Sequence, residues 1–160
     1  KAFIFGGCAV HLYTNARGSN DLDAELEASK SLNIESIILD LDTVYFDDPA
    51  LGASSIEWDS NFNTGIPSLS PDYRAGAVPL VTGDNILQVY LVSAVDIAVS
   101  KLSRLAADDM NDIQSLYSNK RFTLDEFKST AESAIEYSAT PGSLTPNVEY
   151  AIKQLEELKI

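Results

Sequence analysis

The sequence predicts an α+β fold in which a small mixed β-sheet is flanked by helices and followed by a C-terminal helical bundle. A short apolar run, Ala2–Phe5, leads into two glycines, as a strand does where it turns into a helix. Ser19–Leu26 alternates polar and apolar residues over its second half, which is the period of a half-buried strand. Beyond residue 93, apolar residues recur at helical spacing. We therefore divide the chain into an α/β core, residues 1–93, and a helical region, residues 94–160, packed on that core.

The first region alternates helices and strands. Asn33 can cap a helix because its side chain accepts a hydrogen bond from a free backbone N–H of the first turn. The elements expected here are, in chain order, a helix over Cys8–Tyr13, a strand over Ser19–Leu26, a helix over Ile34–Leu41, antiparallel strands at Val44–Phe46 and Ser54–Asp59, and a strand over Ile86–Val92. Between the last two strands, Ser60–Pro79 forms a long loop, and loops of this length are usually functional or disordered.

The second region contains four predicted helices. Hydroxyl residues precede three of them and supply N-caps. The helices are Ala94–Leu105 after Ser93, Asp108–Tyr117, Leu124–Tyr137 after Thr123, and Pro146–Leu158 after Thr145, with a turn at Pro141–Ser143. No internal repeat or low-complexity segment interrupts this pattern.

Composition and charge exclude several classes of function. The chain has 160 residues and a net charge of −13. Extended DNA binding is not expected, because it requires clustered basic residues that neutralise the phosphates. One cysteine and one histidine exclude an internal disulfide and a structural zinc site of the usual kind, and they favour a reducing, cytoplasmic location. The apolar stretch Ala2–Tyr13 is too short to span a membrane, so no membrane partner is expected. The acidic surface suits a basic protein partner.

The residues that suggest chemistry lie in the first quarter of the chain. Gly6 and Gly7 stand at the start of a helix, where bare backbone N–H groups and the helix dipole attract phosphate. Asp21 and Asp23 are two residues apart in a predicted strand, so both carboxylates point to one side and can hold a divalent cation that carries phosphate. The alternatives are a solvated acidic strand face and glycines that only allow close packing.

This combination resembles the DNA polymerase β-like nucleotidyltransferase superfamily, in which Gly-Gly or Gly-Ser precedes Asp-x-Asp by a similar gap. The resemblance implies that Asp21 and Asp23 hold two divalent ions, Mg²⁺ or Mn²⁺. It also implies a third acid on a neighbouring strand that completes the site and helps to deprotonate the attacking hydroxyl. We assign this role to Asp59, with Glu57 on the same strand face as the alternative.

A second block resembles the AbiEii-type minimal nucleotidyltransferases, which carry Lys-Leu-x-Arg on one helix and Asp-x-x-Asp-Ile on the next. The matching residues are Lys101, Arg104, Asp109, Asp112 and Ile113. The resemblance implies that Lys101 lies near the nucleotide, while surface electrostatics between adjacent helical turns is the alternative explanation. Further candidates for binding the triphosphate are Arg104 and the loop residues Arg17 and Arg74.

Together these features predict a metal-dependent nucleotidyltransferase. It would transfer a nucleoside monophosphate from an NTP to a hydroxyl acceptor on a protein or tRNA. The AbiEii resemblance further implies a toxin of a toxin–antitoxin or phage-defence pair, with a cognate antitoxin as partner. One alternative is a catalytically inactive module that binds a partner protein through its acidic surface. Another is a hydrolase or kinase, although the sequence lacks a Walker-type Gly-Lys-Ser/Thr.

Overall fold

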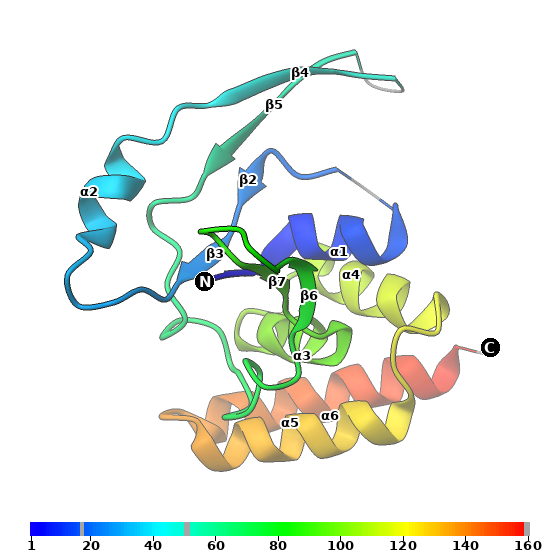
Figure 1. Ribbon diagram of the computed structural model, residues 1–160. Coiled ribbons are helices and arrows are strands. Elements are labelled where there is room, and N and C mark those ends of the chain that lie inside the picture. The colour runs from blue at the N-terminus through cyan, green and yellow to red at the C-terminus, as the bar shows by residue number, and fades with distance from the viewer. Residues whose placement is uncertain (17, 50–51, 159–160) are drawn as a thin grey trace.

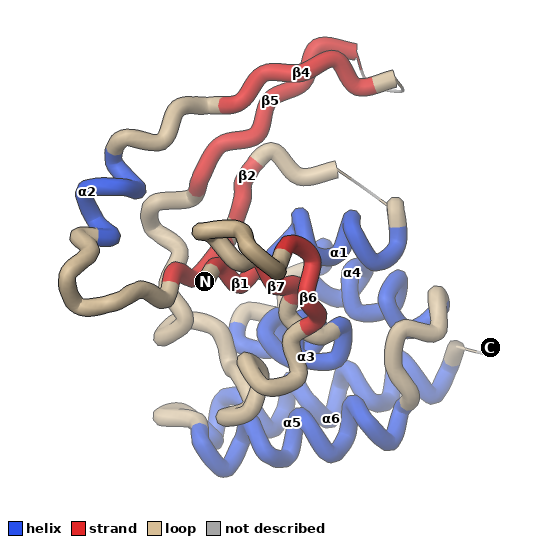
Figure 2. Tube along the Cα trace, in the orientation of Figure 1, coloured by secondary structure: helices blue, strands red, loops and turns tan. Residues whose placement is uncertain are grey.

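The computed structural model describes residues 1–16, 18–49 and 52–158. It confirms an α+β fold with small mixed sheets and C-terminal helices. Figure 1 shows three tiers: an arched arm formed by α2 (Ile34–Leu39), β4 (Val44–Asp48) and β5 (Gly52–Trp58), a sheet in the middle, and a helical layer. This layer ends in the pair formed by α5 (Leu124–Tyr137) and α6 (Pro141–Glu157). In Figure 2 nearly all of the helical residues lie in this last layer, whereas the strands lie in the middle tier and in the arm.

The central sheet has four strands in the order β3-β1-β7-β6. Its strands are β1 (Ala2–Ile4), β3 (Ala24–Leu26), β6 (Val78–Val81) and β7 (Val89–Leu91). β1 pairs antiparallel with β3 and parallel with β7, so the sheet is mixed. The N-terminal strand β1 and the strand β7 therefore lie side by side in the middle of the sheet. The edge strand β6 lies in the segment that the sequence assigned to the end of a loop.

The second sheet has three strands in the order β2-β5-β4: β2 (Asp21–Leu22), β5 (Gly52–Trp58) and β4 (Val44–Asp48). β4 and β5 pair antiparallel, as the sequence predicted. The single strand predicted over Ser19–Leu26 is wrong. β2 bonds to β5, whereas β3 bonds to β1, so the chain changes sheets at Asp23.

The helices other than α2 lie on one side of the central sheet (Figure 1). α1 (Gly6–Thr14) packs against α3 (Ala94–Ser100) and α4 (Ala107–Ser118), and α3 packs on α5 (Leu124–Tyr137), which pairs with α6 (Pro141–Glu157). Side chains from all of these helices join Phe3, Phe5 and Leu91 of the strand region in one apolar core.

The largest differences from the predicted helices are at the end of α3 and at the start of α6. The helix expected to reach Leu105 ends at Ser100 and continues as a short 3₁₀ turn, η1 (Lys101–Ser103), and Leu105 then adopts a left-handed φ of 46°. The last helix begins at Pro141 instead of Pro146, because proline suits the first turn of a helix, where its missing N–H needs no partner. By contrast, α5 begins after the predicted cap Thr123. Asn33 likewise caps α2 (Ile34–Leu39).

Candidate functional site

The side chains of Asp23 and Asp59 meet just beyond the ends of β2 and β5, where the chain leaves the second sheet. The Phe5 N–H donates to the Asp23 carbonyl at 2.8 Å, and the Asp59 N–H donates to the Leu22 carbonyl at 3.1 Å. Because β2 and β5 run parallel, these bonds bring Asp23 and Asp59 side by side just beyond the two strands. Burial raises the pKa of Asp23, and the negative charge of Asp59 raises it further. The two acids therefore form a partly buried pair that favours a cation or a shared proton.

Gly6 lies directly against the side chain of Asp23. Its φ of 60° lies in the left-handed region, and a Cβ at this position would be 1.6 Å from Oδ2 of Asp23. The Asp23 carboxylate thus packs directly against bare backbone at the start of α1. No other residue type could occupy this position without moving Asp23.

A cavity of about 370 Å³ opens above the acid pair. Its lining residues come from the β1–α1 junction, the β2–β3 junction, the segment after β5, the end of α3 with η1 and the residue after it, and the first turn of α4. They are Phe5, Gly6, Asp23, Asp59, Asn61, Phe62, Ile66, Pro67, Ser100, Lys101, Ser103, Arg104 and Asp109. The structure thus brings five of the predicted site residues together from four separate segments. These five are Gly6, Asp23, Asp59, Lys101 and Arg104.

The basic residues of the cavity are held by buried acids. Lys101 is 9% exposed, and its Nζ lies 2.8 Å from Oδ2 of Asp112 and 3.6 Å from Oδ1 of Asp109. Arg104 donates two hydrogen bonds of 2.8 Å to the two carboxylate oxygens of Asp109. The Arg104 side chain is nevertheless 76% exposed, so its remaining N–H groups face solvent at the cavity rim. The positive charge of Lys101 partly offsets the rise in the pKa of Asp23.

Other predicted site residues lie elsewhere. Asp21 is exposed and stands opposite Glu57 in the β2–β5 register, and neither is among the described residues that line the cavity. The carbonyl of Asp21 accepts a hydrogen bond from the Cys8 thiol at 3.2 Å. Gly7 is buried inside α1. Arg17 lies outside the described residues.

Arg74 pairs with Glu25 rather than facing the acid pair. Glu25 Oε2 accepts hydrogen bonds from the Tyr73 hydroxyl at 2.8 Å and from Nε of Arg74 at 3.1 Å, and Oε1 accepts one from Thr64 at 3.3 Å. Burial and the hydrogen bond to Glu25 raise the pKa of Tyr73 to about 12. These contacts anchor the loop after β5 to β3. The loop in turn supplies Asn61, Phe62, Ile66 and Pro67 to the cavity.

Sequence reasoning missed Asn61. Its backbone N–H donates to Oδ1 of Asp59 at 2.8 Å, which orients that carboxylate. The signal was the Asp-x-Asn pattern of residues 59–61, because an aspartate side chain often accepts from the backbone two residues further on. Ser100 and Ser103 also line the cavity from the end of α3 and from η1, and no sequence pattern singled them out.

The acid pair can hold a magnesium ion, although it is not a complete cage. Within residues 1–16, 18–49 and 52–158, no group of three His, Cys, Asp or Glu side chains is arranged to hold a metal. Mg²⁺ commonly uses one or two carboxylates together with substrate phosphates and water. Asp23 and Asp59 supply two such ligands beside an open cavity, so they fit a metal that arrives with a nucleotide.

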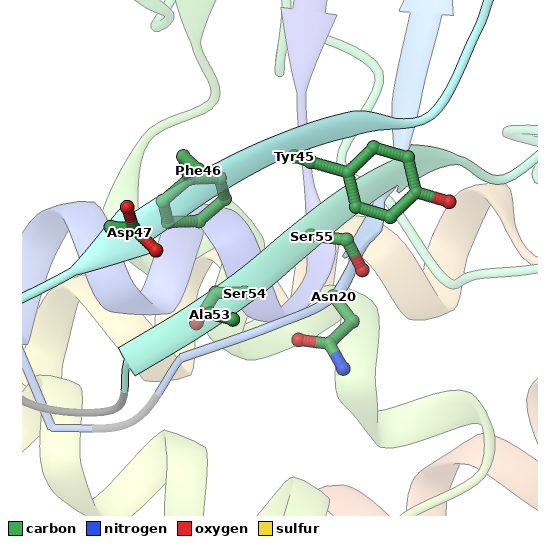
Figure 3. A pocket seen from close by; sticks show the side chains of 7 residues that line it. All are labelled: Asn20, Tyr45, Phe46, Asp47, Ala53, Ser54 and Ser55. Carbon is green, nitrogen blue, oxygen red and sulfur yellow. The ribbon is translucent and has the colours of Figure 1, made fainter.

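A separate hollow of about 600 Å³ lies on the arm (Figure 3). It is lined by Asn20, Tyr45, Phe46, Asp47, Ala53, Ser54 and Ser55, none of which lines the acid-pair cavity. Figure 3 shows these side chains along β4, β5 and the segment that carries Asn20. Asp47 is its single charged side chain among the described residues, and the aromatic side chains are exposed. This hollow therefore lacks the opposed charges of the acid-pair cavity.

Comparison with known proteins gives one match. A family model described as "Nucleotidyltransferase of unknown function (DUF6036)" matches residues 1–157. No curated protein and no solved structure matches the chain. Among the described residues, no helix is both long and apolar enough to cross a membrane.

Proposed function

Because the chain belongs to the nucleotidyltransferase family of unknown function (DUF6036), we propose that it transfers a nucleoside monophosphate from an NTP to a hydroxyl acceptor. The reaction would take place in the cavity of the acid pair. The observation that carries the proposal is the meeting of Asp23 and Asp59 against Gly6, opposite Lys101 and Arg104. Opposed acids and bases around one opening suit a metal-bound triphosphate, since transfer of such groups depends mostly on positioning and charge neutralisation.

In this proposal Asp23 and Asp59 hold Mg²⁺ or Mn²⁺. When bound, the metal would neutralise the triphosphate and stabilise the entering and leaving oxygens. Asp21 is exposed and outside the cavity, so we leave it out of the direct ligands and assign it to the surrounding negative field. Arg104 would contact the outer phosphates from the rim. Lys101 would contribute its charge from a fixed position, since Asp109 and Asp112 hold its ammonium group.

The proposed transfer is a single displacement at the α-phosphorus. The acceptor oxygen forms a bond to this phosphorus while the bond to the bridging oxygen of the β-phosphate breaks. Pyrophosphate leaves with that electron pair. The hydroxyl proton passes to the Asp59 carboxylate, the role that the resemblance implies for the third acid of the site.

The acceptor and the biological role are also proposals. A protein or tRNA hydroxyl and a toxin role with a cognate antitoxin, in the cytoplasm, are supported by the resemblance of Lys101–Ile113 to the AbiEii-type enzymes. The inactive binding module is not favoured, because the matching family is described as a nucleotidyltransferase.

The test is to incubate the protein and Mg²⁺ with a cell lysate and each NTP labelled at the α-phosphate. We expect label in protein or RNA with the wild type, and loss of that label in Asp23→Asn and Asp59→Asn. Asp47→Asn, on the arm and away from the cavity, serves as the matched control and keeps the activity. Equal labelling by Asp23→Asn would contradict the proposal. Release of phosphate from γ-labelled ATP, without pyrophosphate, would indicate a hydrolase instead.

A further inference from the structure

A second hollow of about 320 Å³ adjoins the acid-pair cavity. It lies between the loop at residues 64–69 and the α5–α6 turn, and Figure 1 shows the loop after β5 descending toward that turn. The two cavities share Ile66, Pro67 and Ser103. At this boundary the Ser103 hydroxyl accepts a hydrogen bond from the Ser68 backbone N–H and donates one of 2.9 Å to the Ser68 hydroxyl. The two hollows therefore adjoin along this boundary, and we call them together the cleft.

The two ends of the cleft differ in charge. The acid-pair cavity is lined by five charged side chains: Asp23, Asp59, Lys101, Arg104 and Asp109. Of the described residues that line the second hollow, none is Asp, Glu, Lys, Arg or His. This is unusual for a surface hollow in a chain with 24 acidic and 11 basic residues. A ligand that fills the whole cleft must therefore have one highly charged end and one uncharged end.

The uncharged end offers an aromatic face and hydroxyl groups. Tyr137, the last residue of α5, lines the hollow and is 70% exposed. Bases stack on such rings regardless of sequence, because every base has a π face. Thr140 lies in the α5–α6 turn and Ser143 in the first turn of α6, and both line the hollow. The Ser143 hydroxyl donates to the Thr140 carbonyl at 3.0 Å, so its oxygen can accept a hydrogen bond from a ribose or a base edge.

We propose that this second hollow is the nucleoside subsite, with the base against Tyr137 and the triphosphate directed past Ser103 to the acid pair. The inference rests on the proposed function and deepens it. In this arrangement the α5–α6 turn and Tyr137 distinguish a nucleotide from a bare polyphosphate.

The experiment compares two probes in the presence of Mg²⁺: each of the four NTPs, and inorganic tripolyphosphate, which lacks the nucleoside. Affinities are measured by titration calorimetry. We expect wild-type protein to bind at least one NTP more tightly than tripolyphosphate. Tyr137→Ala should weaken binding of that NTP about tenfold or more, the range found for loss of a stacked base. It should leave tripolyphosphate binding unchanged, whereas Arg104→Ala should weaken both.

Matched controls separate stacking from general damage. Tyr150→Ala removes an exposed tyrosine of α6 that does not line the described part of the cleft, and it should change neither affinity. Tyr137→Phe keeps the ring and should retain NTP binding. If NTP and tripolyphosphate bind equally, or if Tyr137→Ala has no effect, the subsite is wrong while the proposed function stands. If neither probe binds, the proposed function fails, and the subsite fails with it. Weaker acceptor labelling by Tyr137→Ala with unchanged NTP affinity would assign the hollow to the acceptor and also overturn the subsite.

Discussion

Two sets of acids lie side by side in this protein, and their surroundings are opposite. Asp109 and Asp112 are 2% and 3% exposed, and Lys101 and Arg104 bind them. Burial alone would raise the pKa of Asp109, but the hydrogen bonds from Arg104 and the Ala106 N–H, with the charge of Lys101, lower it. Asp23 instead faces another acid, and its pKa is raised by burial and by that neighbour.

The contrast separates scaffold from chemistry. Buried acids that are fully paired hold the polypeptide in place, and removing a partner exposes their desolvation cost. Acids that face each other without a bound cation reduce stability, and such groups cluster at functional sites. The ion pairs of Lys101 and Arg104 with Asp109 and Asp112 therefore act first as scaffold, and we call these four residues the clamp. The clamp forms the wall of the cavity opposite Asp23 and Asp59.

The largest effect is expected from breaking the clamp. Lys101→Met leaves Asp109 and Asp112 buried without their ammonium partner and should lower the free energy of unfolding by about 3–5 kcal/mol. Urea denaturation measures this loss. Lys128→Met is the control, because it removes a lysine from a surface pair with Glu156 and should leave the denaturation midpoint nearly unchanged. If both variants behave alike, the pairing of Lys101 adds nothing to stability.

The next effect concerns the close contact at Gly6. Gly6→Ala and Gly83→Ala both force alanine into a left-handed conformation, which costs about 1–2 kcal/mol. At Gly83 nothing lies within 4 Å of the added methyl group, whereas at Gly6 the methyl group collides with Asp23. Overpacking of this kind adds roughly 1–3 kcal/mol. Thermal or urea unfolding should therefore show a larger loss for Gly6→Ala, and equal losses would refute the packing of Asp23 on Gly6.

Local signals in the sequence were sufficient for much of this picture. Capping residues marked the starts of α2 and α5, and alternation with turn residues marked the pairing of β4 with β5. The fold class followed from these elements. The sequence also indicates Gly6, Asp23 and Asp59 as candidates, and in the structure these three residues line one cavity.

The remainder depends on pairings between distant segments. The alternation from Asp21 to Leu26 is the same whether one strand or two strands form, and only the separate partners β5 and β1 reveal the change of sheets at Asp23. In the same way, the Lys101 motif does not show that its charge is engaged by Asp112. The anchoring of the loop by Glu25 depends on residues 39 to 49 positions away, beyond any local pattern.

The acid pair itself should show a smaller effect of opposite sign. Asp23→Asn removes the repulsion between Asp23 and Asp59 and should raise the free energy of unfolding by about 0.5 kcal/mol, the scale of partly exposed charge pairs. Asp109→Asn, the matched change in the clamp, should lower stability because it removes the ion pairs with Lys101 and Arg104. Urea denaturation of both variants at neutral pH tests the difference in sign. A loss of stability in Asp23→Asn similar to that in Asp109→Asn would remove the distinction between the two sets.

The smallest effect is the pH dependence of the clamp. Because the pKa of Asp109 is lower in the folded protein than in the unfolded chain, its contribution to stability is complete above the unfolded value of about 3.9. That contribution is lost as the pH falls from there through the folded value. Arg104→Gln removes the hydrogen bonds that lower the pKa of Asp109. The variant should therefore lose less stability in acid than the wild type does, by less than about 0.5 kcal/mol, because the arginine is largely exposed and screened by solvent. Urea midpoints of the wild type and the variant between about pH 2 and 5 measure the difference, because the loss occurs below the unfolded value. Parallel curves would show that Arg104 does not set the ionisation of Asp109.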